Sequence, residues 1–211
     1  QNEPPASDHV LFSLPKHISF TPHLGASTNE AQENVGIQVA EQLRDFLTTG
    51  EIRNAINMPS LDASALKEIG GYLDLANSLG RFLAKLGPTN PDAIRVSYHG
   101  DITEKDTSLI SRTVLTGYLE AARPDGQVNI VNSTAVAHDM GLEVAESIIN
   151  ASTEYSELII AELSKGNKKF RVAGTIIGQS PRIVGIDHLY VDTNIKGHFL
   201  IVRNDDRPGI V

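Results

Sequence analysis

The sequence contains no cysteine among its 211 residues, and this absence removes several kinds of chemistry. Disulfide bonds, cysteine nucleophiles and zinc–thiolate sites are all excluded, because each needs a thiol. Positive charge is also scarce, since 18 Lys and Arg stand against 26 Asp and Glu, for a formal net charge of −8. General binding to nucleic acid requires clustered Lys and Arg, so we expect no nucleic-acid partner.

Long apolar runs are missing as well. No stretch approaches the roughly 18–20 apolar residues of a membrane-spanning helix, and the N-terminus lacks the layout of a signal peptide. We therefore expect no membrane partner and a cytoplasmic location. The chain begins at Gln1 and ends at Val211 inside a strand-and-turn pattern, so we expect it to be a piece of a longer protein.

Common motifs of metal, phosphate and nucleophilic chemistry are absent. None of the 7 histidines belongs to an H-E-x-x-H motif or to an i, i+4 pair, so the sequence predicts no metal site. There is no glycine-rich dinucleotide turn, no phosphate-binding loop with its lysine and no serine nucleophile elbow. Candidate catalytic or binding residues must therefore be identified by their sequence surroundings and not by these motifs.

One histidine stands out by its surroundings. In the stretch TPHLGASTNEAQ, His23 lies between Pro22 and Gly25, just before a predicted helix whose N-terminus carries a positive dipole. Glycine allows a close approach by a flat ligand, and a histidine can exchange a proton near neutral pH. The alternative, a turn histidine that only bonds to its own loop, remains open from spacing alone.

The chain divides by pattern into three segments. In residues 1–60, the letters STNE at 27–30 fit a helical capping box, with a hydroxyl at its first position and a glutamate that reaches back. Apolar residues at helical spacing then predict a helix over 30–47, which Gly50 ends. The residues that follow, EIRNAINMPSL, are expected to be extended.

The middle segment, 61–193, reads as helices followed by antiparallel strands. The pattern predicts a helix over 66–86, a half-buried strand in AIRVSYHG and a helix over 108–122. QVNIVNSTAVAHDMG is ambiguous and fits a short strand before a helical turn. Two hairpins follow, one around SKGNKK and one around residues 186–188. The fold class is therefore α/β (α+β), with an antiparallel sheet.

The last segment, 194–211, contains a strand candidate at 199–202 and then a polar turn with Asn204, Asp205 and Asp206. Such side chains can hold a small ligand, although any exposed turn has the same composition. Arg182 follows a proline at a strand start, where it could meet a phosphate or carboxylate or simply form a surface ion pair.

Four stretches make the sequence similar to a known family. LPKHISFTPHLGASTNEAQENVGIQVAEQL resembles the end of the catalytic unit of D-isomer-specific 2-hydroxyacid dehydrogenases. AINMPSL, PRIVGIDHLYVD and HFLIVRNDDRPGIV resemble, more narrowly, the long type of D-3-phosphoglycerate dehydrogenases. The resemblance covers essentially the whole chain. It implies the end of a Rossmann-type catalytic unit over 1–60, an intervening, allosteric substrate-binding domain over 61–193 and the first strand of a ferredoxin-like ACT domain over 194–211.

The resemblance also assigns roles to residues. His23 matches the family's catalytic histidine, and Gly25 with Ala26 matches the turn beside the nicotinamide of NAD. Asn204 and Asp206 match positions at which complete ACT domains bind the inhibitor serine. Arg182 falls where related intervening domains place a basic residue of an anion site.

The implied activity is NAD-dependent oxidation of 3-phosphoglycerate by the full-length enzyme, with serine as a possible effector. The family's catalytic arginine, its glutamate and its dinucleotide turn are absent from these residues, so we expect this stretch alone to be inactive. A homo-oligomer, dimer or tetramer, is expected, together with exposed apolar surface on the helix over 30–47 and on 199–202. Two alternatives remain, namely a non-catalytic anion-binding and assembly module, and a different 2-hydroxyacid dehydrogenase.

Overall fold

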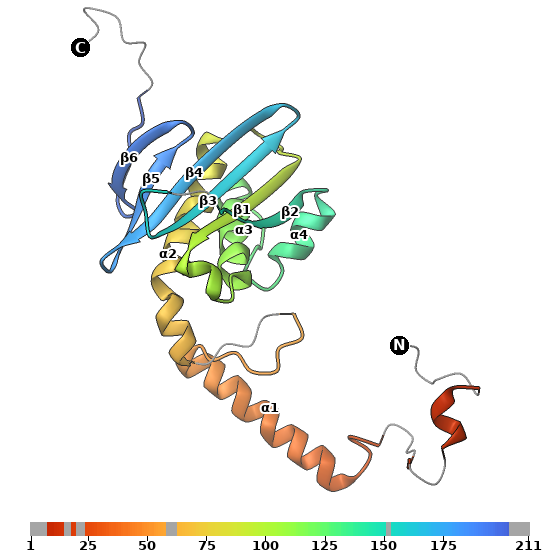
Figure 1. Cartoon of the computed structure of the whole chain (residues 1–211). Helices are drawn as coiled ribbons and strands as arrows, with labels where there is room; N and C mark the ends of the chain where they lie inside the picture. Colours follow the sequence, from red (N-terminus) through yellow and green to blue (C-terminus); the bar gives the residue numbers. More distant parts are fainter. Residues whose placement is uncertain (1–7, 15–17, 20–23, 58–62, 151–152, 203–211) are drawn as a thin grey trace, which may run out of the picture. The chain divides into compact units, whose positions relative to one another are not determined.

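The structure is a computed structural model that describes residues 8–14, 18–19, 24–57, 63–150 and 153–202 (Figure 1). The chain divides into two compact units, Gln1–Glu51 and Ile52–Val211.

The first unit contains a 3-10 helix, η1 (Val10–Ser13), and one long helix, α1 (Asn29–Thr49). The hydroxyl of Thr28 accepts a hydrogen bond from the Ala31 amide at 3.1 Å, so Thr28 caps the helix. The capping box placed at Ser27 is therefore wrong by one residue, because Thr28 takes the extended backbone of an N-cap. At the other end Gly50, at φ 77°, closes the helix as expected.

The apolar stripe of α1 is exposed. None of the described residues of this helix is buried, and its apolar side chains are about half exposed or more. These exposed residues are Val35, Ile37, Val39, Leu43, Phe46 and Leu47. The expectation of uncovered apolar surface on this helix is confirmed.

The second unit is built from one sheet of six strands with helices on one face (Figure 1). The strand order is β2-β1-β3-β4-β5-β6. The strands are β1 (Ala93–Gly100), β2 (Glu143–Ile148), β3 (Glu157–Lys165), β4 (Lys168–Ile177), β5 (Ser180–Ile186) and β6 (Leu189–Asn194). The other elements are α2 (Ala63–Leu86), η2 (Asp101–Glu104), α3 (Ser108–Ala122) and α4 (Ser133–Asp139). Both long helices and the first strand agree with the sequence patterns.

Strands β3 to β6 form an antiparallel meander with two-residue turns. Gly166 and Gly178 begin two of these turns at positive φ, and Asp187 begins the third at φ 56°. Asparagine, aspartate and glycine tolerate that backbone region best, which is why tight hairpins form here. The predicted hairpins are confirmed.

The sheet is mixed rather than purely antiparallel. β2 pairs in parallel with β1, from Ala93 opposite Glu143 to Tyr98 opposite Ile148. No pattern in the sequence predicts β2, because an exposed edge strand with two glutamates carries no buried, alternating pattern. The prediction of an antiparallel sheet is corrected to a mostly antiparallel one.

The segment before α4 is a turn, not the short strand that QVNIVN suggested. The Asn129 side chain accepts hydrogen bonds from the backbone amides of Val131 and Asn132. The side-chain amide of Asn132 donates to the Gln127 carbonyl at 2.9 Å. Asparagine side chains that bond to nearby backbone favour turns over strands. The helical turn predicted after it is present as α4.

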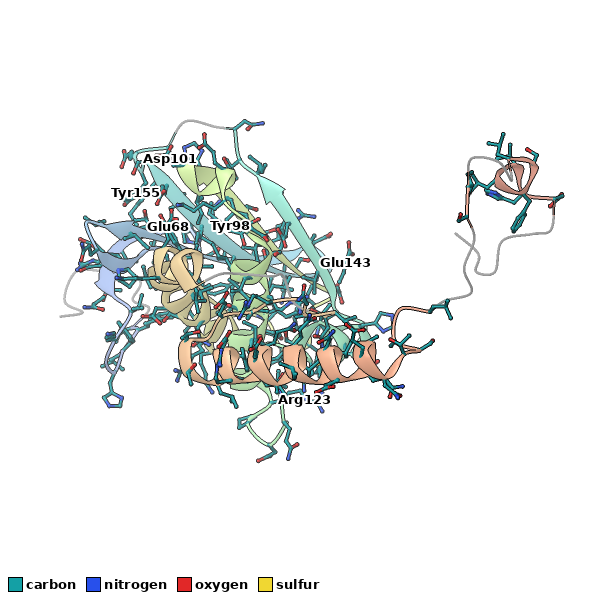
Figure 2. All side chains as sticks on the ribbon, turned by 90° about the horizontal axis from the view of Figure 1, so that it is seen from below. Glu68, Tyr98, Asp101, Arg123, Glu143 and Tyr155 are labelled. Atoms are coloured by element: carbon teal, nitrogen blue, oxygen red, sulfur yellow. The ribbon has the colours of Figure 1, made fainter. Side chains whose placement is uncertain are left out.

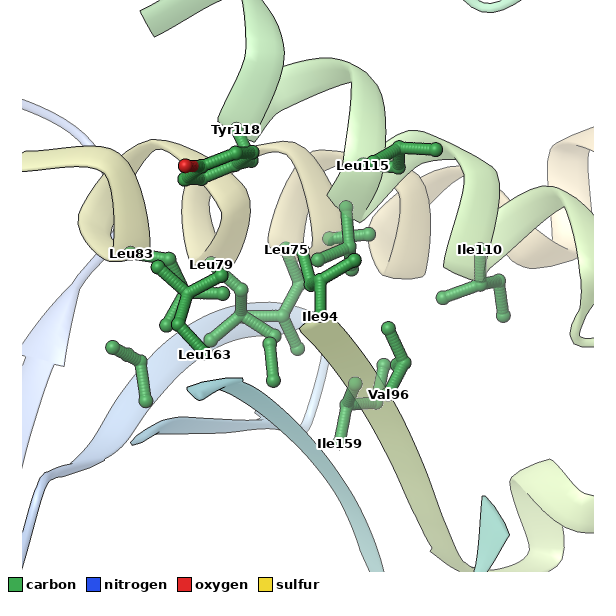
Figure 3. Close-up of a cluster of buried hydrophobic side chains, with 14 of the residues drawn as sticks. Leu75, Leu79, Leu83, Ile94, Val96, Ile110, Leu115, Tyr118, Ile159 and Leu163 are labelled. Atoms are coloured by element: carbon green, nitrogen blue, oxygen red, sulfur yellow. The ribbon is translucent and has the colours of Figure 1, made fainter. Parts of the chain in front are cut away.

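The hydrophobic core lies between α2, α3 and the sheet (Figure 3). Each element contributes fully buried side chains, which are labelled in Figure 3 as Leu75, Leu79, Leu83, Ile94, Val96, Ile110, Leu115, Ile159 and Leu163. Burying one such side chain contributes about 1.5–3 kcal/mol to folding. This packing fixes the positions of both helices against the sheet.

Residues 199–202 form no strand in the described structure, contrary to the prediction. They are exposed, with Leu200 at 90%. A strand exists only through hydrogen bonds to neighbouring strands, and no described strand lies beside this segment. Its exposed apolar surface agrees with the sequence-based expectation.

Candidate functional site

Three of the residues singled out from the sequence, His23, Asn204 and Asp206, lie outside the described residues. Gly25 and Ala26 are described and exposed. They occupy the centre of a turn that the Ser27 amide closes on the Leu24 carbonyl at 3.1 Å. A Cβ built on Gly25 would meet no atom of the described residues within 4 Å, so among these residues the turn leaves room for a flat group.

Arg182 lies on β5, and its side chain is paired with a residue of the neighbouring strand. Its Nε donates to Oδ1 of Asp192 on β6 at 2.7 Å, and its side chain is 30% exposed. An anion at Arg182 would therefore share the guanidinium with a carboxylate. Its role as an anion ligand stays a prediction.

A cleft lies between α2 and the segment that follows β6. Its volume is about 830 Å³. Arg81 and Lys85 line it from α2, and Lys196 and His198 line it from the following segment. Sequence reasoning missed this cleft, although the i, i+4 spacing of Arg81 and Lys85 places both on one helix face.

The cleft combines positive charge with an aromatic wall. The rings of Phe82 and Phe199 meet edge to face, with 5.2 Å between centroids, and tie the C-terminal segment to α2. Three positively charged side chains line the cleft, those of Arg81, Lys85 and Lys196. Asp74 lines it with a negative charge. In a chain of net charge −8, such a local excess of positive charge favours a small anion.

A second polar cluster joins α2, η2 and the start of β3. The Tyr72 hydroxyl donates to the Glu157 carboxylate, and Lys105 pairs with Glu68. Burial, followed by the hydrogen bond to Glu157, raises the pKa of Tyr72 above its ordinary value near 10. The hydroxyl keeps the proton that it donates to Glu157, and this hydrogen bond links α2 to the start of β3.

The described residues contain no group of three or more histidine, aspartate or glutamate side chains able to hold a metal ion. Within the same part of the chain, no helix has the length and apolarity needed to cross a membrane.

Comparison with known proteins places this architecture in a family. The profile of the D-3-phosphoglycerate dehydrogenase intervening domain matches residues 68–187, from α2 to the β5–β6 turn. This chain belongs to the D-3-phosphoglycerate dehydrogenase family. The matched region contains Arg81, Lys85 and Arg182, whereas His23, Lys196 and Asn204 lie outside it.

Similar proteins carry the same family name. The D-3-phosphoglycerate dehydrogenase of Archaeoglobus fulgidus is 32% identical over 212 residues, which are 100% of this chain and 40% of that protein. The Bacillus subtilis enzyme is 32% identical over 99% of this chain and 39% of its own length. D-3-phosphoglycerate dehydrogenase 2, chloroplastic, of Arabidopsis thaliana is 32% identical over 99% of this chain and 36% of its own. The chain thus spans about 40% or less of the length of these relatives.

Proposed function

We propose that the longer protein oxidises 3-phosphoglycerate to 3-phosphohydroxypyruvate with NAD, at the start of serine biosynthesis. The observation that carries this proposal is the similarity to D-3-phosphoglycerate dehydrogenases over essentially the whole chain. These residues would supply the catalytic histidine and most of a regulatory and assembly region.

The proposed chemistry gives His23 one task. As the hydride leaves carbon 2 of the substrate for NAD, the imidazole takes the proton of the 2-hydroxyl group. The turn at Gly25 and Ala26 suits a place beside the flat nicotinamide, because no side chain of the described residues crowds Gly25. The groups that would hold the phosphates of NAD are not among these residues.

The test uses the full-length protein and the appearance of NADH with 3-phosphoglycerate as substrate. We expect His23→Asn to lower kcat by about 10²- to 10⁴-fold, as loss of a general base does. His17→Asn, in the same segment, is the control and should keep its activity. An unchanged kcat in His23→Asn would exclude this role. Faster turnover of another 2-hydroxy acid would instead favour a different dehydrogenase of the family.

A second function concerns the middle domain. The basic cleft beside α2 supports an anion-binding regulatory role, with 3-phosphoglycerate or phosphate as the ligand. Arg182 is the competing position for the same ligand, and serine is the proposed effector at Asn204 and Asp206. A homo-oligomer, dimer or tetramer, would give the domain its assembly role.

Calorimetric titration of this 211-residue chain separates these options. Phosphate, 3-phosphoglycerate and serine are the ligands, and NAD is the comparison for which no saturable binding is expected. Loss of phosphate binding in Arg81→Ala but not in Arg182→Ala would assign the cleft, and the opposite pattern would assign Arg182. Arg123→Ala, an exposed arginine just after α3, is the matched control. Absence of binding at about 1 mM ligand would remove the anion site and leave assembly.

A further inference from the structure

β2 lies at one edge of the sheet and pairs on one side only. β1 is its neighbour, and no described strand lies on its other side. Every residue of β2 except Ala145 is exposed. Figures 1 and 2 show the strand, which begins at Glu143, at the margin of the domain.

The backbone groups of β2 that face away from β1 can be identified. The Glu143 amide donates to the Asp92 carbonyl at 3.0 Å, and the Ile149 amide donates to the Tyr98 carbonyl at 2.7 Å. Because backbone groups alternate sides along a strand, the odd-numbered residues bond to β1. The amide and carbonyl groups of Val144, Glu146 and Ile148 therefore point out of the sheet.

This edge lacks three of the devices that prevent strands from pairing, namely lysine, proline and a bulge. β2 contains no lysine and no proline, and its register with β1 continues without a bulge over 143–148. The other edge differs, because the pairing of β5 with β6 is interrupted between Ile183 and Gly185. Val144 and Ile148 are 39% and 62% exposed and project on the same face.

We propose that β2 pairs antiparallel with β2 of a second copy of this chain, about a two-fold axis at Glu146. In this register the same three residues point outward in both copies, so their amide and carbonyl groups meet. Val144 then lies opposite Ile148 of the partner subunit, and the second such pair follows by symmetry. The contact is self-complementary and closed, so it forms a dimer and not a chain of copies.

The charge of Glu146 opposes this contact. Its carboxylate, which accepts a hydrogen bond from the Thr107 hydroxyl at 3.2 Å, would lie opposite its own copy, and like charges directly opposite each other destabilise a strand pair. A shift of register by two residues would relieve this repulsion but would place Val144 opposite a glutamate. A strand edge of six residues also covers less than the roughly 1,200 Å² of a stable interface. The pairing is therefore weak in isolation, and the charge on Glu146 sets its strength.

This inference rests on the assembly role proposed above, and the experiment keeps the two apart. Sedimentation velocity of this chain, from about 10 µM to about 1 mM, measures association over the range of weak contacts. We expect Glu146→Gln to tighten dimerisation about 2- to 5-fold and Val144→Lys to abolish it. Glu143→Gln removes the same charge away from the axis and should change nothing.

Hydrogen exchange identifies the surface used. The amides of Val144, Glu146 and Ile148 should gain protection as concentration rises, whereas the bonded Glu143 amide should not change. Association without protection of these amides would overturn β2 pairing and leave an oligomer formed by another surface. A monomer at all concentrations, for the native chain and Glu146→Gln alike, would overturn both proposals. Equal dimerisation constants of Glu146→Gln and Glu143→Gln would refute the two-fold axis at Glu146.

Discussion

Gly80 of α2 and Gly117 of α3 create a reciprocal close approach between the two helices. A Cβ on Gly80 would lie 2.1 Å from the Val114 carbonyl oxygen, and one on Gly117 would lie 2.4 Å from the Asn77 carbonyl oxygen. Each glycine thus makes room for the backbone of the opposite helix. Together they permit the tight packing on which the core depends.

We predict that Gly117→Ala lowers the free energy of unfolding by about 1–3 kcal/mol, because backbone must move to admit a methyl group. The matched control is Gly70→Ala, in α2, where a Cβ meets no atom within 4 Å. That change should raise stability by about 0.5–1 kcal/mol, since alanine favours a helix. Urea denaturation measures both, and a neutral Gly117→Ala would show that the helices can separate at little cost.

The buried hydroxyl pair of Tyr98 and Ser111 gives a second prediction. Their oxygens lie 2.5 Å apart, and Ser111 is only 3% exposed. Tyr98→Phe leaves the serine hydroxyl without this partner, so we expect a loss of about 1–3 kcal/mol in unfolding free energy. Tyr190→Phe, at an 89% exposed position, is the control and should be neutral. Equal stability of the two variants would contradict this reading.

Alkaline pH should destabilise the domain. Burial raises the pKa of Tyr98 and Tyr118 above the ordinary value near 10; at Tyr98 the hydrogen bond with Ser111 opposes this rise and the charge of Glu146 adds to it. As pH rises past about 10, the unfolded chain loses these protons first, so the stability that is complete below pH 10 declines above it. Unfolding free energies at pH 8 to 11 measure this decline, which should be shallower in Tyr98→Phe. A decline of the same slope in that variant would exclude Tyr98 as a source.

The N-cap of α1 provides a prediction that distinguishes two neighbouring residues. Thr28→Ala removes the hydroxyl that accepts from the Ala31 amide and should cost about 1 kcal/mol of helix stability. Ser27→Ala, one residue earlier, should be close to neutral. Hydrogen exchange in the first turn of α1 reports both. A larger effect at Ser27 would restore the capping box that the sequence pattern indicated.

The sequence was a good guide where burial or turn chemistry acts locally. α2 and α3 were predicted from apolar spacing, because one face of each helix packs on the core. The sequence pattern predicts the hairpin at Asp187, and aspartate is one of the few residues that tolerate the positive φ found there. β2 could not be predicted, since its structure depends on pairing with β1 and not on its own pattern.

The candidate sites show the same division. The motif around His23 and Gly25 is local, so a sequence suffices to propose its role. The cleft lined by Arg81 and Lys196 joins residues far apart in the chain, and only the fold brings them together. The sequence left Arg182 open between an anion contact and a surface ion pair, and the structure pairs it with Asp192, ten residues later on the adjacent strand.

The strand order has a consequence for how this domain is synthesised. β1 lies between β2 and β3, yet both neighbours follow it in the chain, beyond α3 and α4. On the ribosome, the apolar side chains of Ile94 and Val96 therefore emerge well before a strand exists to pair with them. The meander from β3 to β6 can form quickly through its short turns, but closing it onto β1 costs the entropy of a long loop. Until then, α2 and α3 are the partners that can shield β1 from misfolding.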